Sequence, residues 1–85
     1  MASDVAWQQA AMRQFMIPTQ AQPKQAKRIS DAVYDYANHG RGDVKKLQGD
    51  EGSWRLRVGD WRVIFELHPN LVRVVRVEDR SEVYR

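Results

Sequence analysis

Arginines gather in the segment WRLRVGDWRVIFEL, residues 54–67, where they alternate with large apolar side chains. Within it, Gly59-Asp60 is typical of a two-residue hairpin turn, because a type II′ turn favours glycine at its first central position. This turn places Arg57 directly opposite Arg62, with Arg55 on the same face two residues away. Like charges so placed destabilise a sheet, and the segment therefore raises the question of what the arginines bind.

Two interpretations of the arginines stay open on the pattern alone. The simpler one is a solvated outer sheet face, on which water and flexible side chains relieve the repulsion. The other is a phosphate site, because guanidinium forks match phosphate oxygens two at a time. The hairpin uses three arginines and no lysine, which favours phosphate. Glu66 is the only expected neighbour of opposite charge, and we expect it to pair with Arg73 of the next strand.

Two different spacings of apolar residues predict the strands and helices that position these residues. Alternation predicts three antiparallel strands at 54–58, 61–67 and 71–77, joined by tight turns. Helical spacing predicts one helix from Ser3 or Asp4 to about residue 16 and a second from Pro23 to about residue 37, which Gly40 ends. The predicted fold is therefore α+β: an N-terminal helical hairpin packed on one face of a small antiparallel β-sheet, forming a single domain over 1–85.

Composition narrows the possible functions. The 85 residues include no cysteine, and the formal net charge is only +3, so any nucleic-acid site must rest on where the arginines lie. His39 and His68 have no neighbours at ligand spacing, and we expect neither a metal nor another cofactor. No apolar run approaches the ~20 residues of a membrane span, and the N-terminus lacks a signal-peptide pattern. We expect a cytoplasmic protein.

A longer stretch of motifs resembles a known family. DVKKLQGDEGSWRLRVGDWRVIFEL, followed by VVRVEDRSEVYR, is similar to the RelE/ParE superfamily of type II toxins. In that superfamily a V-K-K-L-x-G segment leads into a Y-R-L-R-V-G-D-Y-R-V-I-Y hairpin, and the C-terminus reads close to V-G-H-R-x-E-V-Y. The resemblance covers residues 42–85, with the motifs in matching order and spacing, and its RelE-like branch fits best. The face assigned above to Arg55, Arg57 and Arg62 agrees with it independently.

The resemblance implies an activity and a partner. The RelE branch cleaves messenger RNA in the ribosomal A site, without a metal, by attack of the 2′-hydroxyl on the adjacent phosphate, and an antitoxin silences it. Arg62 would hold the scissile phosphate, Arg80 would stabilise charge or act as an acid, and Tyr84 would stack on or orient the nucleotide. The expected catalytic residues are thus Arg57, Arg62, Arg80 and Tyr84, and the expected RNA-binding residues are Arg55, Lys45 and Lys46. The two lysines are expected in a loop or turn, where solvated charge is the alternative to RNA contact.

Departures from the family pattern keep other functions open. Glu78-Asp79 precede Arg80, where the family often has Gly-His. Arginine cannot readily accept a proton, so Arg57 is a poor general base, and Glu78 is a possible substitute. The N-terminus shows no clear first strand, so the strand is either truncated or replaced by a partner. The alternatives are a ParE-like inhibitor of DNA gyrase and an inactive homologue. All three imply a cognate antitoxin, whether of the RelB, ParD or Phd type.

Overall fold

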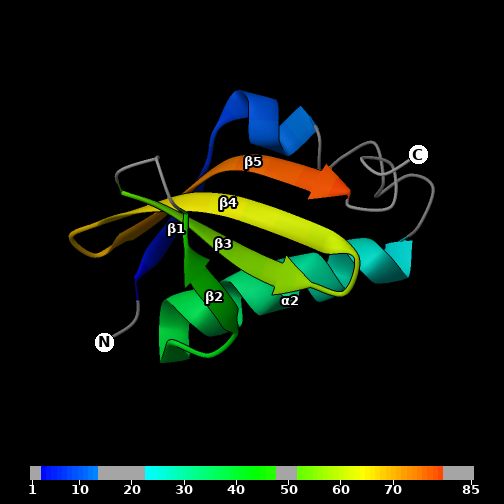
Figure 1. The fold of residues 1–85 in the computed structure, drawn as a ribbon, viewed down its shortest axis with the longest axis horizontal. Helices are drawn as coiled ribbons and strands as arrows, with labels where there is room; N and C mark the ends of the chain where they lie inside the picture. The colour runs from blue at the N-terminus through cyan, green and yellow to red at the C-terminus, as the bar shows by residue number, and fades with distance from the viewer. Residues whose placement is uncertain (1–2, 14–22, 48–51, 80–85) are drawn as a thin grey trace.

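The alternating residues of the second half form the centre of a five-stranded sheet. The structure is a computed structural model, and it describes residues 3–13, 23–47 and 52–79. The strands lie in the order β1-β5-β4-β3-β2, and α2 crosses one face of the sheet (Figure 1). The elements are β1 (Asp4–Trp7), α2 (Pro23–His39), β2 (Asp43–Lys46), β3 (Ser53–Val58), β4 (Trp61–His68) and β5 (Leu71–Asp79). The prediction of an α+β fold is confirmed.

The hairpin of β3 and β4 has the predicted register. Val58 pairs with Trp61 and Arg57 with Arg62, so the turn consists of Gly59 and Asp60. Gly59 has a φ of 59°, as the first central position of a type II′ turn requires. The next turn is equally tight, with Asn70 at a φ of 59°, and it sets β5 against β4.

Helix α2 covers the inner face of this sheet. Its buried residues recur at helical spacing, and they are Ala26, Ile29, Val33 and Ala37. Three of them, Ile29, Val33 and Ala37, pack in one core cluster with inward residues of β3, β4 and β5, such as Leu56, Phe65 and Val74. Gly40, with a φ of 69°, donates its backbone N–H to the carbonyl of Tyr36 at 2.8 Å and so ends the helix as predicted.

The N-terminal half of the predicted helical hairpin is wrong. Asp4–Trp7 is a strand that pairs in parallel with β5, which makes the sheet mixed rather than antiparallel. Only residues 9–13 of the predicted first helix are helical among the described residues, and Ala11 within them is fully buried in the core. The first strand therefore exists but is short, and hydrogen bonds from Asp4 N to Asn70 O and from Gln8 N to Val74 O fix its ends.

The prediction of a loop around the two lysines is also wrong. Lys45 and Lys46 belong to β2, the edge strand that pairs with β3. Gly42, directly before this strand, lies close to the core: a Cβ built on it would lie 2.7 Å from Leu56 Cδ1. Strand pairing therefore holds the lysines in place. Among the described residues, no helix combines the length and the apolar character needed to cross a membrane.

Candidate nucleic-acid interface

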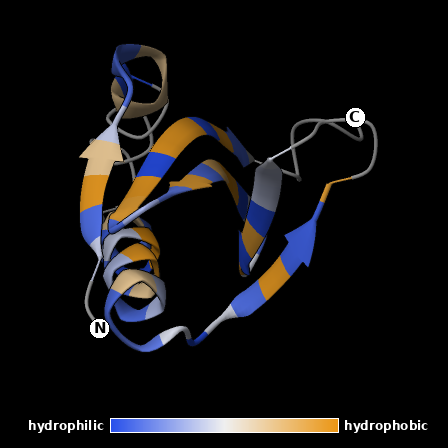
Figure 2. Cartoon of the chain, turned by 90° about the vertical axis from the view of Figure 1, so that its left-hand side faces the viewer, coloured by the Kyte–Doolittle hydropathy of each residue, from blue (hydrophilic) through white to orange (hydrophobic). Residues whose placement is uncertain are grey.

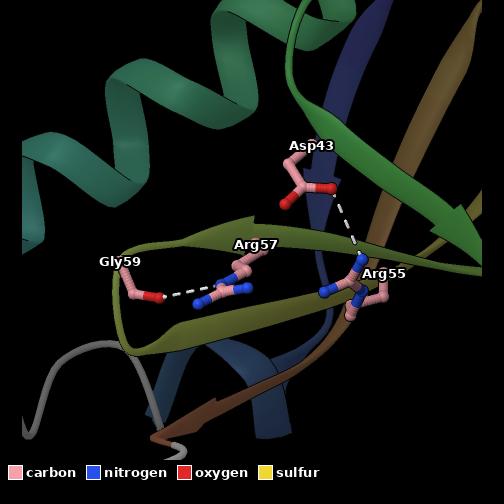
Figure 3. Close-up of polar contacts among 4 residues, drawn as sticks. All are labelled: Asp43, Arg55, Arg57 and Gly59. Atoms are coloured by element: carbon pink, nitrogen blue, oxygen red, sulfur yellow. Dashed lines mark hydrogen bonds and ion pairs between the residues drawn. The ribbon is translucent and has the colours of Figure 1, made fainter.

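The sheet face opposite α2 carries the predicted arginines. Paired residues on neighbouring strands share a face, so the register places Arg57 and Arg62 together on the outer side and Arg55 one step further along β3. Figure 3 shows Arg55 and Arg57 projecting from β3 on the same side, and Figure 2 shows α2 confined to one side of the curved sheet. We call the outer side of β2 to β5, centred on Arg55, Arg57 and Arg62, the arginine face.

Arg62 has a buried donor that no protein group among the described residues accepts from. Its side chain is half-buried, and its buried Nε has no hydrogen-bond partner in the part of the chain that the structure describes. A buried donor without a partner costs free energy, and an anion placed here would satisfy it. Arg57 opposite is exposed, and its Nε donates to the Gly59 carbonyl at a long 3.4 Å. Both guanidinium groups thus keep donors for a ligand.

Arg55 is held by a carboxylate that the sequence analysis did not single out. Its side chain is only 16% exposed, and its Nη2 lies 3.5 Å from Asp43 Oδ1 on the edge strand (Figure 3). The Asp43 side chain is 61% exposed, so water screens this long contact and the ion pair is weak. The pattern of DVKK does not predict a strand, and so Asp43 had no predicted face; as a strand, β2 pairs Asp43 with Arg57.

A pocket brings most of the predicted cations together. It is open to solvent, has a volume of about 400 Å³, and is lined by Lys45, Lys46, Leu47, Arg55 and Arg62. Four of its five lining residues are positively charged, and they come from the three adjacent strands β2, β3 and β4. Leu47 is the one residue here that sequence reasoning missed, and it adds apolar surface beside the cations. The pocket suits an anion that also carries an apolar or ring-shaped group.

Carboxylates border this site more closely than predicted. Glu66 pairs in register with Arg73 as expected, but its carboxylate lies 3.1 Å from His68 Nε2. The expectation that Glu66 is the only nearby opposite charge is wrong, because Asp43 and Glu78 also lie on the arginine face, opposite Arg57 and Arg62 respectively.

Glu78 is itself engaged. Its Oε1 lies 2.7 Å from Arg76 Nε, a short charge-assisted contact between residues on the same side of β5. The suggested role of Glu78 as a general base stays a prediction, with one carboxylate oxygen already in contact with Arg76.

Two predicted site residues lie outside the described part of the chain. These are Arg80 and Tyr84, which follow the end of β5. Within the described ranges, no three His, Asp or Glu side chains are grouped so that they could hold a metal ion. The candidate site is therefore a cluster of arginine and lysine side chains, which can bind an anion and stabilise negative charge that develops on it.

Comparison with known proteins identifies the family. The sequence model described as the ParE toxin of type II toxin-antitoxin systems, parDE, matches residues 8–84. The chain belongs to this toxin family. The toxin is thus a member of the RelE/ParE superfamily, as its hairpin and C-terminal motifs indicated. No curated protein matches its sequence.

Solved structures of toxins from several organisms share the fold. The toxin-antitoxin complex RelBE2 from Mycobacterium tuberculosis includes a chain with a TM-score of 0.78 and 19% identity, covering 95% of this toxin and 94% of that chain. The YoeB dimer from Staphylococcus aureus gives 0.77 and 15%, covering 92% and 97%. The Escherichia coli DinJ-YafQ complex gives 0.75 and 17%, with both chains covered completely. At these identities the likeness establishes the RelE-like fold.

Proposed function

We propose that this toxin is a ribosome-dependent endoribonuclease that cleaves messenger RNA without a metal. The observation that carries the proposal is the pocket of Lys45, Lys46, Arg55 and Arg62, in which the buried Nε of Arg62 lacks a partner among the described residues. Donors that are fixed in advance and point at a phosphate can stabilise the charge that develops when the phosphate is attacked. The structural likeness to RelE, YoeB and YafQ chains supports the nuclease branch of the superfamily.

The proposed reaction is an internal transfer within the RNA. The 2′-oxygen forms a bond to the adjacent phosphorus, and the bond from phosphorus to the 5′-oxygen of the next nucleotide breaks. The 2′-hydroxyl loses its proton and the leaving 5′-oxygen gains one, so the products carry a cyclic phosphate and a 5′-hydroxyl. Arg62 and Arg57 would stabilise the extra negative charge on the phosphate. Arg80 as charge stabiliser or acid and Tyr84 as the residue that orients the nucleotide complete the proposal.

The proposed partners follow from the same surface. The messenger RNA would be bound on the ribosome, in the cytoplasm. A cognate antitoxin would hold the toxin inactive by covering the arginine face with acidic groups, by adding to the exposed edge of β2, or both. β2 is the outermost strand in the order of the sheet, and such an edge offers free backbone donors and acceptors.

Induced expression in bacterial cells tests the proposal. We expect discrete cuts within codons when primer extension maps the messages, and we expect Arg62→Ala to reduce cleavage by about 10²–10³-fold, the cost of removing one such donor. Arg73→Ala is the matched control. It removes the same charge from the same sheet face, on β5 opposite Glu66, which lies about 13 Å from Arg62 along β4 at 3.3 Å per residue. Equal cleavage by wild type and Arg62→Ala would overturn the assignment of Arg62.

A second candidate function has its own support. Asp43 and Glu78 on the arginine face disfavour a polyanion, and the matching family is described as a ParE toxin. A ParE-like toxin would inhibit DNA gyrase without cleaving RNA. Filamented cells and linearised DNA with intact messages would establish this function in place of the first. An inactive homologue would produce neither effect.

A further inference from the structure

The charges on the arginine face follow an order that runs across the strands. The row nearest the β3–β4 turn reads Asp43, Arg57, Arg62, Glu78 from β2 to β5, so that two positive charges lie between two negative ones. The next row, two residues further along the strands, reads Lys45, Arg55, Ile64, Arg76. The two rows are about 7 Å apart, because a strand rises 3.3 Å per residue.

This order gives a bound polyanion one favourable direction. A backbone laid across the strands through the first row would meet a carboxylate on either side, at Asp43 or at Glu78. A backbone laid along the strands would pass from the pair of Arg57 and Arg62 to Arg55 and meet Asp43 there, whose carboxylate is 61% exposed and makes only a long contact of 3.5 Å to Arg55 Nη2. The row spacing of about 7 Å is close to the separation of adjacent phosphates in an extended single strand. The strand direction therefore suits successive phosphates.

The two ends of the second row differ in whether their positive charges already have an ion-pair partner. On the β5 side, Glu78 already neutralises Arg76 at 2.7 Å. On the β2 side, neither Lys45 nor Lys46 has an ion-pair partner among the described residues, and both line the pocket. An anion leaving Arg55 toward β2 thus meets Lys45, which has no ion-pair partner among the described residues, beside the weakly held Asp43. Leu47 in the same pocket offers apolar contact to a ribose or base.

We infer that Asp43 and Glu78 form an acidic frame that aligns a single-stranded RNA backbone with β3 and β4, from the pair Arg57–Arg62 to the pocket of Lys45 and Lys46. The inference rests on the proposed RNA-binding function and adds to it the direction of the substrate and two residues that determine it. Asp43 and Glu78 are positioning residues. They act by making the other paths across the face unfavourable.

Binding of a short single-stranded RNA tests the frame separately from cleavage. The probe is a fluorescent 2′-O-methylated oligoribonucleotide of about six nucleotides, which cannot undergo 2′-attack, and its affinity for the full chain is measured by anisotropy over a range of salt concentrations. We expect Asp43→Asn and Glu78→Gln each to bind about three- to fivefold more tightly, since each frees an arginine from a partly exposed ion pair. The added phosphate contact should steepen the salt dependence.

Lys45→Ala tests the path toward β2, because Lys45 pairs with Arg55 on the arginine face, whereas Lys46 pairs with Trp54. It should weaken binding and lower the slope of log affinity against log salt by about 0.7, the value for one contact to a single strand. The matched controls are Asp31→Asn and Lys27→Ala, exposed residues of α2 on the far side of the sheet, which change the net charge equally.

The outcomes separate the frame from the function. If the Asp43 and Glu78 variants bind like Asp31→Asn while wild type binds the probe well, the frame is wrong and the proposed nuclease stands. If Lys45→Ala binds like Lys27→Ala, the path toward β2 is wrong. If neither wild type nor any variant binds the probe while induced cells still show cut messages, the frame is overturned and the nuclease is not. Absence of both binding and cuts overturns both.

Discussion

The two faces of the β3–β4 hairpin differ in what their side chains contact. On the inner face, Leu56, Val63 and Phe65 are at most 2% exposed and pack against α2 and its neighbours. On the outer face, Arg57 and Arg62 lie side by side without an ion-pair partner among the described residues. The same backbone therefore carries a face selected for packing and a face selected for charge. Along these strands, substitutions of inward residues should therefore change stability, and substitutions of outward residues should change activity.

The inner face should show the largest effect. Phe65→Ala removes a side chain that is 1% exposed and whose ring lies 5.1 Å from that of Tyr36. Such a truncation costs about 3–5 kcal/mol, against a total stability of roughly 4–13 kcal/mol for a domain of this size. Chemical denaturation should show a protein close to unfolding, with loss of toxicity as a consequence. Leu67→Ala, in the same strand but at a 42% exposed position, should cost less than about 1.5 kcal/mol.

Substitution of Gly42, a residue beside the outer face, should nevertheless destabilise the protein as a core substitution does. Gly42 has a φ of 143°, and an added Cβ would lie 2.7 Å from Leu56 Cδ1. We expect Gly42→Ala to destabilise the toxin by about 1–3 kcal/mol, through overpacking and backbone strain, and to loosen β2 together with its lysines. Thermal unfolding measures the first effect and hydrogen exchange on β2 the second. Gly40→Ala is the control for positive φ without a clash, because its φ of 69° lies in the left-handed region that other residues can adopt and the space around the Cβ is open. Equal costs would show that neither the contact with Leu56 nor the larger φ of Gly42 contributes.

A substitution on the outer face should reduce activity without reducing stability. Arg62→Lys retains the charge but replaces the planar fork by a single ammonium group, which cannot bind a phosphate through two parallel hydrogen bonds. We expect message cleavage to fall by about tenfold or more, equivalent to about 1.4 kcal/mol of transition-state stabilisation, while the free energy of unfolding stays within about 0.5 kcal/mol. A large loss of stability in this variant would mean that Arg62 belongs to the packed face as much as to the outer one.

The hairpin could be read from the sequence because its signals are local. Gly59 fixes the turn, the alternation of Trp54 to Val58 fixes the faces, and together they predict the observed pairing of Arg57 with Arg62. Helix α2 was predicted for the same reason, with its stripe from Ala26 to Ala37 and its end at Gly40.

The edges of the sheet could not be read in this way. Asp4–Trp7 has only four residues, and its strand form depends on pairing with β5, which lies more than sixty residues away in the sequence. β2 alternates poorly in DVKK and is held by pairing with β3. The carboxylate of Asp43 was missed with it, because a residue in a loop has no defined face. When a strand forms only through long-range pairing, the residues that it brings to a site cannot be predicted from the local sequence.

The smallest expected effect concerns the directly opposed pair of Arg57 and Arg62. Arg57→Gln removes one of two like charges that directly oppose each other, and it loses only a long hydrogen bond of 3.4 Å to the Gly59 carbonyl. Since the side chain is exposed and water screens the repulsion, the variant should be more stable by about 0.2–0.5 kcal/mol. The gain in urea denaturation should shrink as salt is added, because salt already screens the repulsion in the wild type. Loss of cleavage alongside this gain would show that the toxin retains an unfavourable charge pair for its ligand, whereas unchanged cleavage would leave Arg62 as the principal phosphate contact of the pair.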